Sequence, residues 1–83
     1  MKEIRVDAQT PKTSIEFNLL ERSQVELFVH NVGRSRSIRV AKVTMHKGLQ
    51  QINIQTDKLQ KGIYVYVLKA NQQQMDFGRL VIH

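Results

Sequence analysis

Hydrophobic and polar residues alternate along most of this 83-residue chain, in short runs separated by polar turns. Alternation with a period of two is typical of β-strands that bury one face, because successive side chains point to opposite sides of a strand. The spacing of three and four positions that marks an amphipathic helix is missing from the sequence. The runs predict strands with these apolar members: Ile4, Val6 and Ala8; Ile15, Phe17 and Leu19; Val25, Leu27 and Val29; Ile38, Val40, Ala41, Val43 and Met45; Ile52 and Ile54; Ile63 to Leu68; Met75 to Ile82.

The spacing of these strands indicates the fold class. Short strands with turns about every 8–12 residues are typical of β-sandwiches. A chain of this length holds one domain. We therefore predict an all-β fold, an immunoglobulin-like antiparallel β-sandwich of about seven strands, in a single domain over residues 1–83.

The strand that begins at Ile63 is apolar on both faces. The side chains of Ile63, Val65 and Val67 point one way, and the alternate side chains, which include both tyrosines, point the other way. A strand without a polar face needs cover on both sides, so we place it in the middle of the sandwich. We expect the tyrosines to be core residues whose hydroxyls reach the surface. The predicted core is Phe17, Leu27, Val29, Ile52, Ile54, Ile63, Val65 and Val67.

Three local irregularities also carry predictions. The apolar phase slips between Val40 and Ala41, which indicates a β-bulge. Gly33 lies in a turn, where it can adopt a positive φ at little cost, and Gly62 is expected to need a backbone conformation that a Cβ would penalise. Phe28 shares the otherwise polar face of its strand, so part of that face is expected to be covered.

The net charge of +6 is unevenly distributed. The residues from Arg34 to Thr56 include five basic side chains and no acidic one: Arg34, Arg36, Arg39, Lys42 and Lys47. Such a segment could meet nucleic acid, a phosphorylated glycolipid or an acidic protein surface. The interpretation that we prefer is a solvated strand edge, where basic residues discourage aggregation. The composition leaves these interpretations open.

Other function classes are disfavoured. The chain has no cysteine, which excludes a disulfide scaffold, and no apolar run approaches the roughly 20 residues of a membrane span. His30, His46 and His83 lack the paired spacing of zinc ligands. Asp57 and Asp76 could form an acid–base pair, but turn positions explain them better. We therefore predict a non-enzymatic protein without catalytic, cofactor-binding or metal-binding residues.

One segment is similar to a nucleic-acid motif. Residues Lys61 to Val67 share a basic residue, a glycine and aromatic residues with the segment by which RNA-recognition sheets stack bases. However, Ile63 occupies the first aromatic position of that motif, and Tyr64 replaces a small residue. A small basic nucleic-acid-binding β domain therefore remains an alternative, although we expect no nucleic-acid partner.

The chain from Thr10 to His83 resembles the C-terminal sorting domain of proteins that the type IX secretion system of Bacteroidota exports. The resemblance lies in a proline-containing start, two glycine turns, a Leu-x-x-Gly-Ile-Tyr motif and a closing basic–aliphatic strand. This chain has Thr10-Pro11 where the family commonly has Asn-Pro, and it ends on His83 instead of a basic residue. The matching motif positions are Gly33, Gly48, Leu59, Gly62, Ile63 and Tyr64, and the closing strand is Gly78, Arg79, Leu80, Val81, Ile82 and His83.

The resemblance implies that the domain is an address label. It would direct a larger parent cargo protein, with a signal peptide upstream of Met1, through the type IX translocon and its outer-membrane shuttle components. A sortase-like cysteine peptidase typically removes such domains. The location would be the periplasm in transit and then the cell surface or the extracellular space. Recognition would fall on Gly78 to His83, whose exposed edge can pair with a receptor strand. The alternative is a free-standing immunoglobulin-like interaction module.

Overall fold

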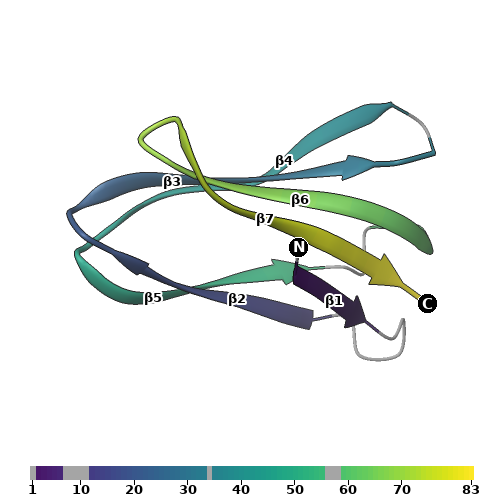
Figure 1. The fold of residues 1–83 in the computed structure, drawn as a ribbon, viewed down its shortest axis with the longest axis horizontal. Coiled ribbons are helices and arrows are strands. Elements are labelled where there is room, and N and C mark those ends of the chain that lie inside the picture. The colour runs from purple at the N-terminus through teal and green to yellow at the C-terminus, as the bar shows by residue number, and fades with distance from the viewer. Residues whose placement is uncertain (1, 7–11, 34, 56–58) are drawn as a thin grey trace.

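A computed structural model describes residues 2–6, 12–33, 35–55 and 59–83 of the chain. These residues form seven strands and no helix, which confirms the predicted all-β class (Figure 1). The described residues do not include seven positions on which the sequence analysis draws: Met1, Ala8, Thr10, Pro11, Arg34, Thr56 and Asp57. The strands are β1 (Lys2–Val6), β2 (Lys12–Leu19), β3 (Ser23–Asn31), β4 (Arg36–Met45), β5 (Gly48–Gln55), β6 (Gly62–Ala70) and β7 (Gln73–Ile82).

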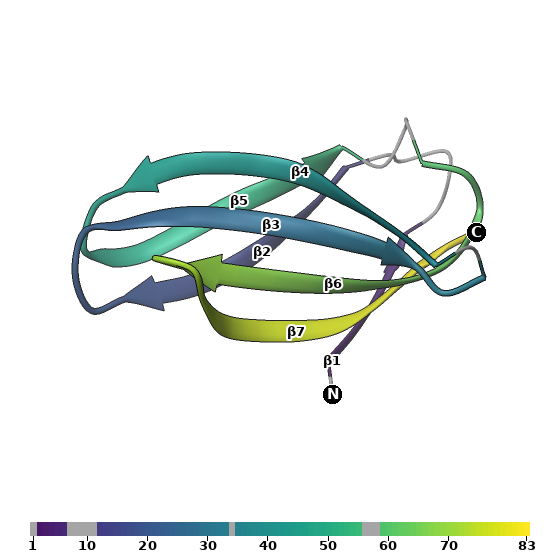
Figure 2. The same ribbon diagram turned by 90° about the horizontal axis from the view of Figure 1, so that it is seen from above.

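The strands form two layers. One sheet has the order β1-β7-β6-β3-β4, and the other pairs β2 with β5. Figure 1 shows most of the first sheet above the second, and Figure 2, seen from above, shows β4 towards one edge of the first sheet and β1 towards the other. The order β7-β6-β3-β4 opposite β2-β5 corresponds to the central strands of an immunoglobulin sandwich, which confirms that fold prediction. One detail is wrong: β1 pairs with β7 in parallel, so the sandwich is not antiparallel throughout. The chain between these two strands is long enough for the crossover that a parallel pair needs.

The core lies between the sheets, and only part of it was predicted. Five of the predicted residues, Phe17, Leu27, Val29, Ile52 and Ile54, are buried. The prediction is wrong for Ile63, which is 43% exposed, and for Val65 and Val67, which are half-buried on the outer side of β6. The full set of buried hydrophobic residues is Ile15, Phe17, Leu19, Val25, Leu27, Val29, Ile52, Ile54, Tyr64, Tyr66, Leu68, Leu80 and Ile82.

The pairing of β6 with β3 explains why the buried face of β6 differs from the predicted one. Leu27 lies opposite Leu68, and Val29 lies opposite Tyr66. Residues that face each other across an antiparallel pair lie on the same side of the sheet. Because β3 has its apolar stripe on one face, this register turns the tyrosine face of β6 inward and the valine face outward.

The predicted bulge is confirmed on β4. Leu27 pairs with Ala41, while the next residue, Phe28, pairs with Arg39, which leaves Val40 as the extra residue. In the turn before β4, the positive φ falls on Ser35, at 49°, and not on Gly33. The Gly33 amide instead donates a hydrogen bond of 2.9 Å to Oδ1 of Asn31.

A two-residue loop joins β6 to β7. Ala70 pairs with Gln73, and Asn71 and Gln72 between them have φ values of 50° and 69°. Positive φ at both loop residues is characteristic of a type I′ hairpin. Asn71 also pairs with Gln24: its amide donates to the Gln24 carbonyl at 2.8 Å, and its Oδ1 accepts from the Gln24 amide at 2.9 Å. Gln72 therefore bears the strain of a left-handed conformation without the local bonding that asparagine offers.

The loop gives a prediction about stability. Replacing Gln72 by glycine removes the Cβ that disfavours positive φ, so Gln72→Gly should stabilise the domain by about 1 kcal/mol in urea denaturation. The control is Gln74→Gly. Because Gln74 lies within β7, a glycine at this position should destabilise the domain. Equal effects of the two substitutions would contradict the type I′ account.

A second prediction tests which face of β6 is inward. Leu68→Ala removes a fully buried side chain and should cost about 2–5 kcal/mol of unfolding free energy. Val67→Ala, on the outer side of the same strand, should cost about 1 kcal/mol or less. Both can be measured by thermal and urea unfolding, and a reversed order would contradict the observed register.

Candidate functional site

The closing strand lies inside the larger sheet. Its residues Leu80 and Ile82 are buried in the core, with exposed fractions of 0% and 4%. Arg79 is exposed, and Val81 is half-buried on the same outer side of β7. Gly78 lies opposite Tyr66. The strand therefore combines a buried aliphatic anchor with an exposed guanidinium, while its role in recognition stays a prediction.

The expected exposed edge of this strand is covered, so that prediction is wrong. β7 pairs with β6 on one side and with β1 on the other, where Lys2 pairs with Gly78 and Val6 with Ile82. The covering strand comes from residues that precede the resemblance at Thr10. The pairing of β1 with β7 is non-local, because almost the whole chain separates the two strands.

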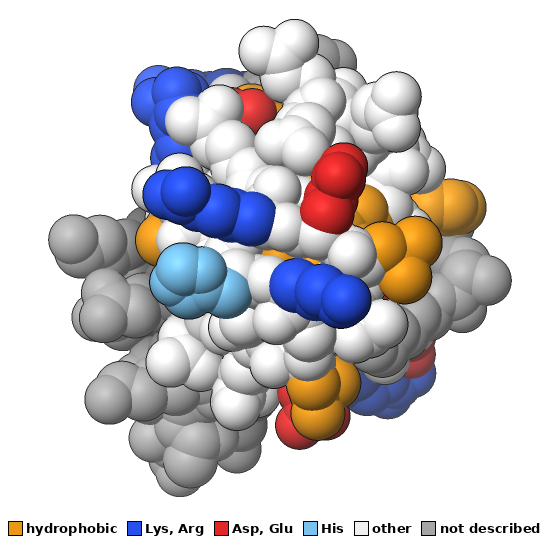
Figure 3. Space-filling view, turned by 90° about the vertical axis from the view of Figure 1, so that its left-hand side faces the viewer, with side chains coloured by type: hydrophobic (Ala, Val, Ile, Leu, Met, Phe, Trp, Pro, Cys, Tyr) orange, Lys and Arg blue, Asp and Glu red, His pale blue; other side chains and the backbone are white. Residues whose placement is uncertain are grey.

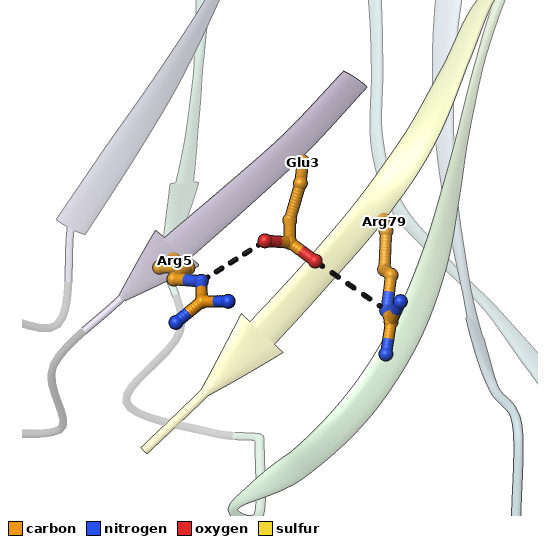
Figure 4. A network of polar contacts seen from close by, with 3 residues as sticks. All are labelled: Glu3, Arg5 and Arg79. Atoms are coloured by element: carbon orange, nitrogen blue, oxygen red, sulfur yellow. Dashed lines mark hydrogen bonds and ion pairs between the residues drawn. The ribbon is translucent and has the colours of Figure 1, made fainter. Parts of the chain in front are cut away.

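A small ion-pair network joins β1 to β7. Glu3 lies between Arg5 and Arg79 (Figure 4), with the Arg5 Nε at 2.9 Å from Oε2 and the Arg79 Nε at 3.6 Å from Oε1. The hydrogen bond from Arg5, aided by the charges of both arginines, lowers the pKa of Glu3. These side chains are solvated, so the network contributes little to stability. It does mean that Arg79 already has a partner within the domain.

The Leu-x-x-Gly-Ile-Tyr motif closes the corner between β5 and β6. The Tyr64 hydroxyl donates a hydrogen bond of 2.7 Å to the backbone carbonyl of Gln60, four residues earlier. This is the tyrosine corner of immunoglobulin-like sandwiches. Leu59 packs against the core from the same corner, whereas Ile63 points outward. The motif residues therefore have a structural role that is typical of the fold.

Two motif glycines have conformations that other residues rarely adopt. Gly62 has a φ of 154°, which confirms the prediction for this position, and Gly48 has a φ of 115° at the start of β5. A Cβ at Gly48 would meet no atom within 4 Å. The backbone conformation, and not the lack of space, therefore explains this glycine.

The two tyrosines of β6 do not present their rings to a ligand. Tyr66 is fully buried, and its hydroxyl has no hydrogen-bond partner among the described residues. Burial, with a contribution from the charge of Asp76, raises the pKa of Tyr66. The expectation that both hydroxyls reach the surface is wrong for Tyr66. Since Tyr64 is buried as well, these rings cannot stack on bases as the RNA-recognition interpretation requires.

The basic segment runs along an edge strand. β4 is the last strand of its sheet, and Arg36, Arg39 and Lys42 are exposed on it, while Lys47 lies in the following turn. This placement agrees with the interpretation as a solvated edge. At the end of the sandwich where the turns after β2, β4 and β6 lie, Figure 3 shows blue, red and orange side chains scattered among white ones. That end carries no continuous patch of one kind among the described residues.

Hollows on the surface are small or open. A half-open cavity of about 210 Å³ lies beside Val29, Arg36, Ile38 and Tyr64. Ligand pockets usually enclose about 300–1,000 Å³. Within the described ranges, no three His, Cys, Asp or Glu residues are close enough to hold a metal ion, and no helix is long and apolar enough to span a membrane. His30 lies on β3, His46 follows β4 and His83 follows β7.

Sequence reasoning missed the outer face of the larger sheet as a site. Ile63 and Phe77 are each 43% exposed there, next to half-buried hydrophobic residues. Two signals pointed to it: the second apolar face of β6, and Phe28 on an otherwise polar face of β3. The sequence could not show that these residues are neighbours.

No family model matches the chain, and no curated protein matches it.

A third prediction concerns the corner. Tyr64→Phe removes the bond to the Gln60 carbonyl and should cost about 1 kcal/mol. Gly62→Val forces a β-branched residue into a strained φ and should cost about 1–3 kcal/mol. Gly33→Val, where φ is not positive, is the matched control and should cost less. Denaturant midpoints measure all three, and a fully stable Gly62→Val variant would rule out the strain at this glycine.

Proposed function

We propose that this chain is a non-enzymatic recognition module, and specifically a C-terminal sorting domain that targets a larger cargo protein for export across the outer membrane by the type IX secretion system. The resemblance from Thr10 to His83 supports this role. The observation that carries it is the closing strand, in which Leu80 and Ile82 are anchored in the core while Arg79 stays at the surface.

The partners follow from this proposal. The domain would contact the type IX translocon and shuttle components, and a sortase-like cysteine peptidase would act on the chain that joins it to the upstream cargo. The cargo would pass through the periplasm to the cell surface or beyond. The domain itself would provide only a folded surface, for which a rigid sandwich is well suited.

The geometry favours recognition through side chains over recognition through a free strand edge. Because β1 occupies the edge of β7, an incoming receptor strand would first have to displace it. Arg79 and Val81 on the outer side of β7 need no such rearrangement. We therefore place the contact with the export machinery on these side chains.

The second candidate function is a free-standing immunoglobulin-like interaction module. One observation favours it specifically: the larger sheet keeps hydrophobic residues on the face that points away from the core. Such a surface suits binding to another protein, with or without an export role.

The fourth prediction tests the sorting role with a cargo fused to this domain, in a Bacteroidota host that has a type IX system. Arg79→Ala should lower export while the melting temperature stays unchanged, because the guanidinium is exposed. Leu80→Ala should lower export only through instability, at a cost of about 2–5 kcal/mol. Arg22→Ala, an exposed arginine in the turn after β2, is the matched control.

The substitution Glu3→Gln distinguishes two possible roles of Arg79, which are recognition by the export machinery and attachment of β1 to the sheet. It removes the charge that pairs with Arg79 and leaves the guanidinium in place. If Glu3→Gln impairs export as strongly as Arg79→Ala does, the arginine acts by holding β1. Export of the Arg79→Ala variant at the level of Arg22→Ala would reject recognition through Arg79.

A further inference from the structure

The outer face of the larger sheet, meaning the side turned away from β2 and β5, has a hydrophobic centre. Phe28, Val67 and Phe77 lie side by side across β3, β6 and β7. Val65 and the pair of Ile63 and Val81 continue this surface along the strands. We call these six residues the outer apolar cluster: Phe28, Ile63, Val65, Val67, Phe77 and Val81.

This cluster is unusual for an outer sheet face. Antiparallel sheets with one solvated side normally alternate hydrophobic residues inside and polar residues outside. Here β6 is hydrophobic on both sides, and its outer side is flanked by a phenylalanine on each neighbouring strand. No described segment covers Ile63 or Phe77, each of which keeps 43% of its surface exposed. Contiguous apolar surface of this kind generally marks an interaction site.

The margin of the cluster is basic. Cross-strand pairing places five basic and two acidic residues on the same face: Arg5, Arg39, Lys42, Lys69 and Arg79, with Glu3 and Glu26. Both carboxylates are already shared with arginines: Glu26 lies 3.5 Å from Arg39, and Glu3 pairs with Arg5 and Arg79. The Lys69 ammonium lies over the Phe28 ring, 5.1 Å from its centre. The face therefore carries an excess of positive charge next to apolar surface.

The charges indicate what kind of partner fits. A second copy would bring the same basic margin against it, and the whole chain carries a net charge of +6, so like charges would meet. Base stacking on Phe28 is disfavoured because Lys69 lies over its ring, which leaves Phe77 as the single aromatic side chain open to a base on this face of the described sheet. Membrane insertion needs side chains that reach well below the headgroups, whereas Val65, Val67 and Val81 are half-buried within the sheet.

We propose that the outer apolar cluster and its basic margin form a docking surface for an acidic protein surface, one that presents hydrophobic side chains with carboxylates around them. The cluster supplies the desolvated centre of the interface, and Lys69, Arg39 and Arg79 supply the complementary charge. The inference does not depend on the export role, since a domain that fails the export test can still bind such a partner.

The test uses the purified domain and a synthetic peptide in which glutamate and phenylalanine alternate at every second position, with serine between them. An extended peptide of this design presents both side-chain types on one face. Calorimetry should show saturable binding that weakens as salt is raised. In NMR titration the shifted amides should cluster at Phe28, Val67 and Phe77. The same peptide with lysine in place of glutamate should not bind.

Two pairs of variants link the binding to this face. Lys69→Glu and Phe77→Ser should each weaken the affinity at least about tenfold. Their matched controls are Lys47→Glu, in the turn after β4, and Leu49→Ser, which is 74% exposed on the smaller sheet. Both controls should bind like the unsubstituted domain. Lys69→Glu keeps the test decisive if Phe77→Ser is unstable, which melting temperatures will show.

Several results would overturn the proposal. Failure of the acidic peptide to bind, or equal losses in the test and control variants, would reject the docking surface. Equal binding of the lysine peptide would reject the role of charge. Tighter binding of an oligothymidylate or of vesicles of phosphatidylglycerol and phosphatidylcholine at the same amides would assign the face to nucleic acid or membrane. A concentration-dependent dimer that Phe77→Ser abolishes would assign it to a second copy.

Discussion

The register between β3 and β6 is the constraint on which the rest of this structure depends. Val25, Leu27 and Val29 give β3 its buried face, and β6 must match it because paired residues share a side of the sheet. Leu68 and Tyr66 are the matching residues. A shift of one residue would bring the valines of β6 inward and the tyrosines outward. The burial of both tyrosines follows from this pairing and not from their chemistry.

The same register decides what the domain offers to partners. Because β6 has no polar side, turning its tyrosine face inward leaves hydrophobic side chains on the outside, next to Phe28 and Phe77. Cross-strand pairs of aromatic and β-branched side chains add to the stability of the sheet. The hydrophobic surface that stays exposed on this face is also suited to the binding that we propose.

The closing strand shows how one segment combines stability with exposure. Leu80 and Ile82 complete the core, while Arg79 on the opposite face takes part in the network with Glu3 of β1. An alternating strand can carry both roles because its two faces are physically separate. Nothing in the sequence indicated that β1 would cover the edge of this strand.

The sequence by itself determined the local properties of the chain. The period of two predicted the strands, the slip at Val40 predicted the bulge, and Gly62 indicated a backbone conformation that disfavours a Cβ, since each depends on neighbouring residues only. Only the tertiary structure decided which face of β6 is buried, that β1 pairs in parallel with β7, and that Phe28 and Phe77 belong to one surface. These features depend on pairing between segments far apart in the chain. Where both faces of a strand are hydrophobic, its own pattern cannot choose between them, and the register of the neighbouring strand makes the choice.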